Sequence, residues 1–251
     1  MKILVPLKRV PDADTCIRLR SNGSGIETEG VKFVVNPFDA IALEEALRLK
    51  GKFSAVEIVA VTLGGSDSVE QLRAGLAMGA DRAVLIHVPQ PLDSFAVAKV
   101  LAEFHRGERP AFVLMGKQAI DDDSNQAGQM LAGLLGIAQV TFVSKLELLD
   151  GGTRARCSRE TDAGIETVEL AFPAVLTTDL RLNEPRYISL PGIMKAKKKP
   201  IEEVTLAQLG VEAVSRTTVL KLEAPPRRQA GVRVKSVDEL ITKLRDEAKV
   251  I

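Results

Sequence analysis

Short apolar runs alternate with amphipathic stretches through the first two-thirds of the chain, and this rhythm constrains the fold more than any other feature. The apolar runs have the length of buried strands and lie at residues 2–7, 55–64, 82–88 and 111–116. The amphipathic stretches place apolar residues at helical spacing among charges and lie at residues 38–50, 66–79, 94–106 and 123–136. Strands that alternate with helices indicate a parallel sheet with right-handed crossovers. We therefore predict a doubly wound, mostly parallel α/β fold of the Rossmann-like type, which binds ligands at the carboxyl ends of its strands.

The composition agrees with such a core and excludes several classes of protein. Hydrophobic residues make up 45% of the 251 residues and aromatic residues only 4%, so the core is aliphatic, as in parallel sheets covered by helices. Lys and Arg number 34 against 33 acids, so the charge predicts no nucleic-acid partner. No apolar run reaches the roughly 18 residues of a membrane-spanning helix. The first apolar run reads as a strand rather than a signal peptide, and Cys16 and Cys157 read as reduced thiols of a cytosol-like compartment.

After residue 146 the pattern changes to antiparallel strands. Turn sequences at residues 150–152 and 162–164 separate strand-like runs. Residues 173–179 form a further apolar run that we expect to return to the main sheet. The antiparallel excursion is therefore an insertion into one α/β domain rather than a separate domain.

The last part of the chain lacks the rhythm of the sheet. Residues 223–232 are polar and contain proline, whereas residues 236–249 have the cap and the apolar stripe of an amphipathic helix. We predict an α/β domain over residues 1–222 and a C-terminal arm over residues 223–251. The stripe allows two arrangements, one in which the arm folds back on its own domain and one in which it packs on another subunit.

The most unusual stretch is GKQAIDDDSNQAGQ, residues 116–129, where three consecutive aspartates follow an apolar run. A metal site needs carboxylates that converge from several directions, whereas three successive residues on a turn point different ways. Acids in a first helical turn also cap free amides and suit the helix dipole, so we favour capping by Asp121, Asp122 and Asp123 and predict no metal. The start of a helix after a strand also suits a phosphate, to which Ser124 and the amides that follow would donate.

Other predicted strand ends converge on the same edge of the sheet. Pro6 closes the first apolar run, Asn36 precedes a helix, and Leu63 ends the second run. Together with residues 118–129 they would surround one pocket, although Pro, Asn and Gly are also ordinary turn residues. The Walker A sequence and the GxGxxG sequence are both absent. No Ser/His/Asp or Cys/His arrangement and no pair of catalytic acids is readable, so the chain shows no chemistry of its own.

A basic stretch at residues 193–200 follows an isolated leucine, Leu190. Cations at the end of a helix are usually solvated and suit its dipole. An exposed apolar residue beside positive charge is also suited to docking on an acidic, partly apolar surface. Both readings stay open from the residues alone.

Several long segments resemble, in order, the β subunits of electron transfer flavoproteins. They are VPLKRVPDADTCIRL, VKFVVNPFDAIALEEALRLK, LAMGADRAV, GKQAIDDDSNQAGQMLAGLLG, RETDAGIETVELAFPAVLTTDLRLNEPRY, LPGIMKAKKKPIE and AGVRVKSVDELITKL. The resemblance implies a heterodimer with an α subunit that carries most of the FAD site, while the β subunit holds AMP. It also implies electron transfer from acyl-CoA and other dehydrogenases to a membrane quinone oxidoreductase, without substrate turnover by this chain.

The resemblance assigns site residues by position. The AMP pocket would comprise Pro6, Asn36, Leu63, Gln118, Ala119, Ile120, Asp121, Asp122, Asp123, Ser124, Asn125, Gln126, Ala127, Gly128 and Gln129. Phe38 would lie near the flavin, and Glu160 would pair across subunits and restrain the flavin domain. In a recognition loop at residues 184–200, Leu190 would be the anchor, with the basic segment Lys195, Lys197, Lys198 and Lys199 beside it.

Differences from the family pattern leave three alternatives. Ala13 stands where many members have a Tyr near the flavin, and Pro6 stands where others have Ala. Electron-bifurcating relatives bind a second FAD in place of AMP, but Asn125 and Gln126 favour AMP. A universal-stress-type nucleotide-binding domain and a metal-dependent hydrolase are the other two readings. We expect a bacterial cytoplasm, or a mitochondrial matrix if the source is a eukaryote.

Overall fold

The computed structural model describes residues 1–226 and 230–251. The chain divides into two compact units, one of residues 1–17 and 28–218, the other of residues 18–27 and 219–251. The first unit contains the sheet and all the helices around it. Within the described residues, no helix is long and apolar enough to cross a membrane.

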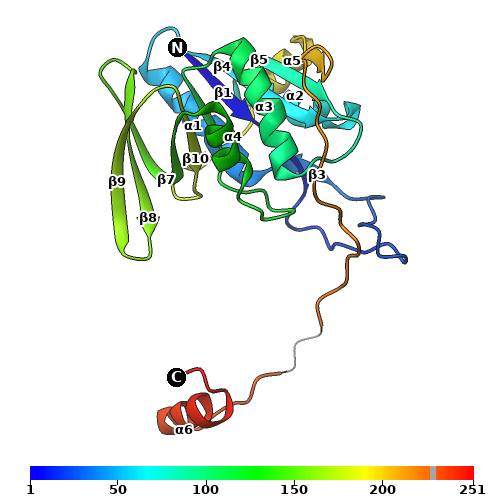
Figure 1. Ribbon diagram of the computed structural model, residues 1–251, viewed down its shortest axis with the longest axis vertical. Coiled ribbons are helices and arrows are strands. Elements are labelled where there is room, and N and C mark those ends of the chain that lie inside the picture. Colours follow the sequence, from blue (N-terminus) through cyan, green and yellow to red (C-terminus); the bar gives the residue numbers. More distant parts are fainter. Residues whose placement is uncertain (227–229) are drawn as a thin grey trace. The chain divides into compact units, whose positions relative to one another are not determined.

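Nine strands within the described residues form one sheet in the order β11-β5-β4-β1-β6-β10-β7-β8-β9 (Figure 1). Their bounds are β1 Lys2–Pro6, β4 Glu57–Gly64, β5 Arg82–His87, β6 Phe112–Gly116, β7 Ala138–Leu149, β8 Arg154–Thr161, β9 Gly164–Ala171, β10 Ala174–Thr178 and β11 Glu202–Thr205. All pairs from β11 to β7 are parallel, whereas β7–β8 and β8–β9 are antiparallel. The predicted α/β sheet, its antiparallel excursion and the returning strand β10 are therefore confirmed. A separate antiparallel pair joins β2 Arg9–Pro11 to β3 Phe33–Val35.

Helices cover both faces of the sheet, as predicted. Their bounds are α1 Pro37–Lys52, α2 Val69–Met78, α3 Ser94–Glu108, α4 Ala127–Leu135 and α5 Leu190–Lys198, with a short 3-10 turn η1 at Ser66–Ser68 before α2. Alternate residues of β1 point to opposite faces, because side chains along a strand alternate. Ile3 packs in a cluster with Leu43 of α1 and with α2, while Leu4 packs in a second cluster with Leu101 of α3 and Leu131 of α4.

The chain switches direction between β1 and β6. After β1 it proceeds through β4 and β5 on one side, and after β5 it returns to β6 on the other side of β1. The helices that follow β1 and β6, namely α1 and α4, therefore lie on opposite faces and leave a crevice between their first turns. Open α/β sheets bind their ligands at such a switch point.

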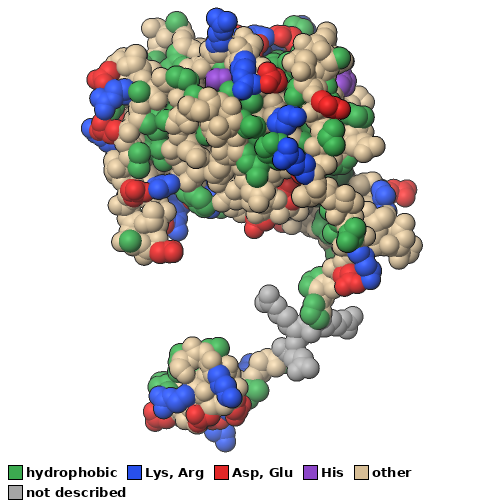
Figure 2. Space-filling model, in the orientation of Figure 1, with side chains coloured by type: hydrophobic (Ala, Val, Ile, Leu, Met, Phe, Trp, Pro, Cys, Tyr) green, Lys and Arg blue, Asp and Glu red, His purple; other side chains and the backbone are tan. Residues whose placement is uncertain are grey.

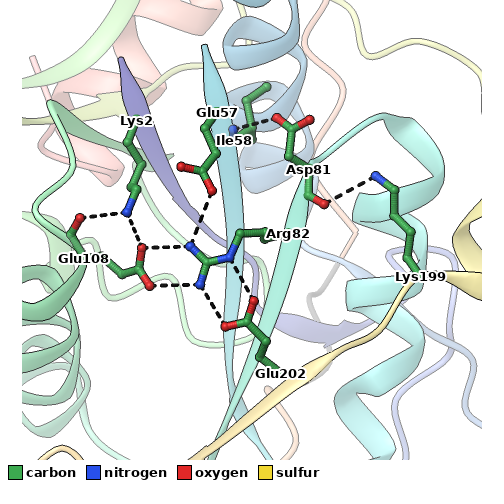
Figure 3. Close-up of polar contacts among 8 residues, drawn as sticks. All are labelled: Lys2, Glu57, Ile58, Asp81, Arg82, Glu108, Lys199 and Glu202. Atoms are coloured by element: carbon green, nitrogen blue, oxygen red, sulfur yellow. Dashed lines mark hydrogen bonds and ion pairs between the residues drawn. The ribbon is translucent and has the colours of Figure 1, made fainter. Parts of the chain in front are cut away.

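An ionic cluster attaches the short edge strand β11 to the sheet (Figure 3). The guanidinium of Arg82 in β5 donates to Glu108 at the end of α3, at 3.0 and 3.1 Å, and to Glu202 of β11, at 2.8 Å. Lys2 of β1 also pairs with Glu108 at 2.6 Å. Hydrogen bonds from Arg82 to Glu202 and Glu108 raise the pKa of Arg82 above its ordinary value.

The antiparallel strands carry a ladder of ion pairs on their exposed side. Arg154 and Arg156 pair with Glu169 across β8 and β9 at 2.8 and 2.7 Å, and Arg159 pairs with Glu166 at 2.6 Å. Figure 2 shows acidic and basic side chains side by side over this part of the sheet. Opposite charges that face each other on neighbouring strands stabilise their pairing.

The second unit contains the predicted C-terminal helix. α6 spans Val237–Thr242 and continues into a π-helical turn, η2, at Lys243–Glu247. Ser236 caps it, because its side-chain oxygen accepts the Glu239 N–H at 3.2 Å. The Glu239 carboxylate accepts from the Lys235 N–H rather than from Ser236, so only half of the capping box forms as predicted.

One local prediction was wrong. The helix expected over residues 123–136 begins only at Ala127, because Asp123 and Asn125 have φ of 53° and 49°, which a right-handed helix excludes. The aspartates therefore lie in a loop before α4 and not in its first turn. Of the two histidines, His87 is partly exposed and contacts Glu203 at 2.8 Å, whereas His105 is buried.

Candidate functional site

A cavity of about 630 Å³ opens at the carboxyl ends of β1, β4 and β6, at the switch point of the sheet. One wall is the loop after β6 together with the first turn of α4, and another is the turn after β4. The segment after β5 contributes apolar side chains. The residues that line it include Pro6, Lys8, Arg9, Asn36, Asp39, Leu63, Gly64, Leu92, Val97, Leu101, Met115, Gly116 and Lys117.

The structure brings most of the sequence-predicted pocket residues together. Those that line the cavity are Pro6, Asn36, Leu63, Gln118, Ala119, Asp121, Asp122, Ser124, Asn125, Gln126, Ala127 and Gly128. Ile120, Asp123 and Gln129 belong to the same loop and helix start but do not line it. Segments separated by more than 80 residues therefore meet at one place, as parallel strand ends require.

Asn36 holds the loop after β6 in position. Its Nδ2 donates to the carbonyl oxygen of Gln118 at 2.8 Å, and its Oδ1 accepts from the Ile120 N–H at 3.3 Å. Asn36 precedes Pro37 at the start of α1 and is buried, so its amide is fixed by the helix. The side chain thus works as a bridge between α1 and the loop.

Lys8 pairs with two of the three aspartates. Its Nζ lies 2.8 Å from Asp121 Oδ1 and 2.8 Å from Asp122 Oδ2. Burial by itself would lower the pKa of Lys8, but hydrogen bonds to both carboxylates and their charges raise the pKa overall. Burial would likewise raise the pKa of Asp122, yet Lys8 and the Ser124 N–H hold it below its usual range. Lys8 therefore offsets part of the negative charge of the two carboxylates.

The aspartates shape the loop before α4 through local hydrogen bonds and not as helix caps. Asp122 accepts the Ser124 N–H at 3.1 Å, and Asp123 accepts from the side-chain amide of Gln118. Within the described residues, no group of three His, Cys, Asp or Glu side chains is placed to hold a metal ion.

Asp39 is a site residue that the sequence reasoning missed. It lies in the first turn of α1, is 6% exposed, and accepts the Lys8 N–H at 2.8 Å and the Gly116 N–H at 3.0 Å. It thereby joins the ends of β1 and β6 beneath the cavity. Burial raises the pKa of Asp39 to about 7 despite these hydrogen bonds. One indication of this role was present in the sequence, namely that Asp39 directly follows Phe38. The burial of its carboxyl group could not be predicted from a single residue.

Two glycines allow close approach at the cavity. A Cβ on Gly116 would lie 2.5 Å from the Asp39 carboxylate and 2.6 Å from Phe38, and a Cβ on Gly128 would lie 2.6 Å from Thr177. Side chains at these positions would separate β6 from α1, or α4 from the sheet. The helix start at α4 can therefore lie directly above the strand ends, where its free N–H groups suit an anion.

A smaller cavity of about 230 Å³ lies beside the first. It is lined by Lys117, Phe142, Ser144, Glu160, Asp179 and Arg181. Lys117 pairs with Asp179 at 2.8 Å, and its Nζ lies 5.4 Å from the ring centre of Phe38 and 4.7 Å from that of Phe142. Phe38 is buried, and Glu160 pairs with Arg181 of the same chain. Glu160 thus lines this cavity, Phe38 lies buried outside its lining, and Ala13 is exposed.

The remaining predicted residues lie on α5, away from both cavities. Ser189 caps this helix by accepting the Gly192 N–H at 3.2 Å. Leu190 is 78% exposed, and Lys195, Lys197 and Lys198 are exposed. Lys199 differs, because its Nζ donates to the carbonyl oxygen of Ala80 at 2.7 Å and to that of Asp81, as Figure 3 shows for Asp81.

The sequence is similar to known proteins over its whole length. A family model described as "Electron transfer flavoprotein domain" matches residues 24–209. The chain is 54% identical to "Electron transfer flavoprotein subunit beta" of Bradyrhizobium diazoefficiens, with both chains covered completely. It is 50% identical to the protein "Electron transfer flavoprotein subunit beta, mitochondrial" of Arabidopsis thaliana over the whole of both chains. It is 46% identical to the human protein "Electron transfer flavoprotein subunit beta", covering 100% of this chain and 99% of the other. The chain therefore belongs to the electron transfer flavoprotein family.

Proposed function

We propose that this chain is the nucleotide-holding β subunit of a heterodimeric electron transfer flavoprotein. It binds AMP as a structural ligand, supports the FAD that an α subunit mainly holds, and turns over no substrate itself. It accepts docking by acyl-CoA and other dehydrogenases, and the heterodimer passes electrons to a membrane quinone oxidoreductase. The observation that carries the proposal is the 630 Å³ cavity at the switch point, closed by the loop before α4.

The residues around the cavity fit an adenine nucleotide. Leu63, Leu92 and Leu101 offer an apolar wall suited to a base, while Ser124, Gln126 and the first turn of α4 offer donors suited to a phosphate. Lys8 offsets part of the negative charge of Asp121 and Asp122, so their carboxylates repel a phosphate less at this place. The cavity is thus polar at one wall and apolar at another, as a nucleotide requires.

The residues around the smaller cavity fit a role beside the flavin. Phe142 offers aromatic surface, Lys117 offers a cation 4.7 Å from the ring centre of Phe142, and Phe38 lies buried behind Lys117, its ring centre 5.4 Å from the Lys117 Nζ. FAD supplies the electron-carrying chemistry when it is bound. Glu160, which pairs with Arg181 within this chain, would exchange that partner for a cation of the α subunit and so restrain the flavin domain. The C-terminal arm, residues 223–251, would pack on the α subunit through the apolar stripe of α6.

The alternative is an electron-bifurcating subunit with a second FAD in the same cavity. Asn125 and Gln126 favour AMP, since both line the cavity and stand in a loop whose sequence differs from the pattern of bifurcating relatives. Denaturing the purified heterodimer and identifying the released nucleotides by chromatography distinguishes the two. We expect one FAD and one AMP for each heterodimer. Release of two FAD and no AMP would replace the proposal by its alternative. If FAD were the only adenine nucleotide released, AMP binding would be refuted.

A further inference from the structure

The proposed docking helix α5 presents apolar side chains to solvent, and they cannot hold it in place. On the helix, Leu190 is 78% exposed and Met194 is 60% exposed, and Tyr187 in the segment before it is 96% exposed. An apolar face turned away from the core contributes no burial that would fix the helix. The position of α5 therefore depends on its opposite side, which packs on α2 at Gly192 and Ala196, and on polar contacts at its two ends.

The C-terminal end of α5 is held by an arginine of α2. Arg73 Nη1 donates to the carbonyl oxygen of Ala196 at 2.6 Å and to that of Lys199. The last carbonyl groups of a helix lack the usual partners within the helix, and a cation at this end interacts favourably with the helix dipole. The Lys199 ammonium bonds in turn to the carbonyl oxygen of Ala80, directly after α2. Ala196 is 2% exposed and completes this contact with α2.

The segment before α5 is held by a buried carboxylate of α1. Glu44 is 3% exposed, and Arg186 reaches it through Nε at 2.6 Å and Nη2 at 3.1 Å. Arg48 donates to the same carboxylate at 3.0 Å. Burial would raise the pKa of Glu44, but hydrogen bonds from Arg186 and Arg48 lower it overall, so the group is ionised. Asn183 adds a bond to the carbonyl oxygen of Ile41 at 3.1 Å.

We propose that Arg73 and Glu44 are positioning residues that preorganise the docking helix. They hold the backbone on both sides of Leu190, so that a partner dehydrogenase meets an anchor that is already in place. A segment that is ordered before association does not pay its ordering entropy on binding, so the complex is tighter. Lys199 belongs to this anchorage, and the cations that face the partner are Lys195, Lys197 and Lys198. The inference rests on the proposed docking function of α5.

The main test is Arg73→Met in the complete heterodimer, with a purified acyl-CoA dehydrogenase as electron donor. We expect the KM for the flavoprotein to rise about tenfold while kcat and the flavin absorption spectrum stay unchanged. Amide hydrogen exchange should accelerate over residues 189–199 and stay unchanged in β1 and β6. Arg73→Lys keeps a cation and should recover part of the loss in KM. Arg106→Met, on a helix that covers the opposite face of the sheet, is the matched control.

Three outcomes would overturn the proposal. Unchanged exchange over residues 189–199 in Arg73→Met would show that Arg73 does not hold the helix. Unchanged KM in that variant, when Leu190→Ala does raise KM, would show that holding the helix does not matter for docking. Unchanged KM in both variants would remove the docking function on which the proposal rests. If Arg73→Met does not assemble, Lys199→Met gives the same test from the other side of the contact.

Discussion

At the scale of single residues, the site depends on the pairing of one lysine with two aspartates that lie far from it in the sequence. Lys8 reaches across to Asp121 and Asp122, more than 110 residues away. This pairing offsets part of the negative charge of an acidic loop next to a proposed phosphate site. Like charges close together in a partly buried site would otherwise cost binding free energy.

Lys8→Met is therefore expected to weaken retention of the nucleotide. Two uncompensated carboxylates would remain beside the phosphate, at a cost of about 1.5–3 kcal/mol for a lost charge-assisted bond, which is at least tenfold in affinity. The measurement is the dissociation rate of AMP from the heterodimer during dialysis. Lys32→Met is the control, because Lys32 is 74% exposed and pairs only with Asp12. Equal retention in wild type and Lys8→Met would contradict the role of the pair.

Asp39 predicts a dependence of stability on pH. Its pKa is raised by burial to about 7 in the folded chain, against about 4 in an unfolded chain. Between these values the folded state holds a proton that the unfolded state has released, so the contribution of Asp39 to the free energy of unfolding falls as the pH rises. Asp39→Asn removes this contribution, and the variant also loses one acceptor for a backbone N–H, which costs about 1–3 kcal/mol.

The thermal midpoint of wild type should therefore exceed that of Asp39→Asn by more at pH 5 than at pH 7.5. Differential scanning calorimetry of the heterodimer at both values measures this difference. Asp12→Asn serves as a control, because hydrogen bonds from Lys32 lower the pKa of that exposed carboxyl instead. A difference between wild type and Asp39→Asn that does not change with pH would argue against a raised pKa.

At the scale of elements, α5 separates anchorage from recognition. Its buried side rests on α2 through Ala196, while its exposed side carries Leu190 and the lysines. The sequence placed all four lysines in one basic segment, and the structure gives Lys199 a different environment. An apolar anchor at the centre of a docking surface usually contributes more binding free energy than the charges around it.

Leu190→Ala is expected to weaken electron transfer from a partner dehydrogenase. Loss of an anchor of this size costs about 1–3 kcal/mol, a rise in KM of at least fivefold. Stopped-flow reduction of the flavin by the reduced dehydrogenase gives the affinity, and the flavin spectrum reports the integrity of the heterodimer. Leu180→Ala, at an apolar residue that is 55% exposed outside α5, is the control. The anchor assignment fails if both variants transfer electrons as fast as wild type.

At the scale of the whole molecule, the cavity joins parts that the sequence keeps far apart. Its walls come from β1, α1, β4, α3, β6 and α4, and so from helices on both faces of the sheet. A ligand that contacts all of these elements stabilises only the folded state, because an unfolded chain has no such cavity. Its contribution grows with the free ligand concentration.

Removal of AMP should therefore lower the thermal midpoint of the heterodimer without dissociating FAD at room temperature. Adding AMP back at about 100 times its Kd should restore about 2.7 kcal/mol of stability. Calorimetry of nucleotide-free and reloaded samples tests this, with inosine monophosphate as a matched control for the base. A midpoint that does not respond to AMP would show that the nucleotide does not bind this fold.

The sequence alone determined the class of fold and the order of its elements, because strand and helix periodicity are local properties of the chain. The alternation through residue 116 and the turns of the antiparallel excursion needed no tertiary information. Positions in the cavity followed from the same pattern, since the carboxyl ends of parallel strands meet at one edge. Family resemblance then supplied the residues of the loop before α4, most of which line the cavity.

Only the tertiary structure decided which charges meet and where a helix begins. Residues 123–126 have the composition of a helix start, yet contacts from Lys8 and Gln118 hold the aspartates in a loop, and α4 begins at Ala127. The burial of Asp39 and the hydrogen bonds from Arg73 to the end of α5 arise because segments far apart in the sequence approach one another in the folded chain. Such contacts depend on the packing of the whole sheet, which periodicity does not encode.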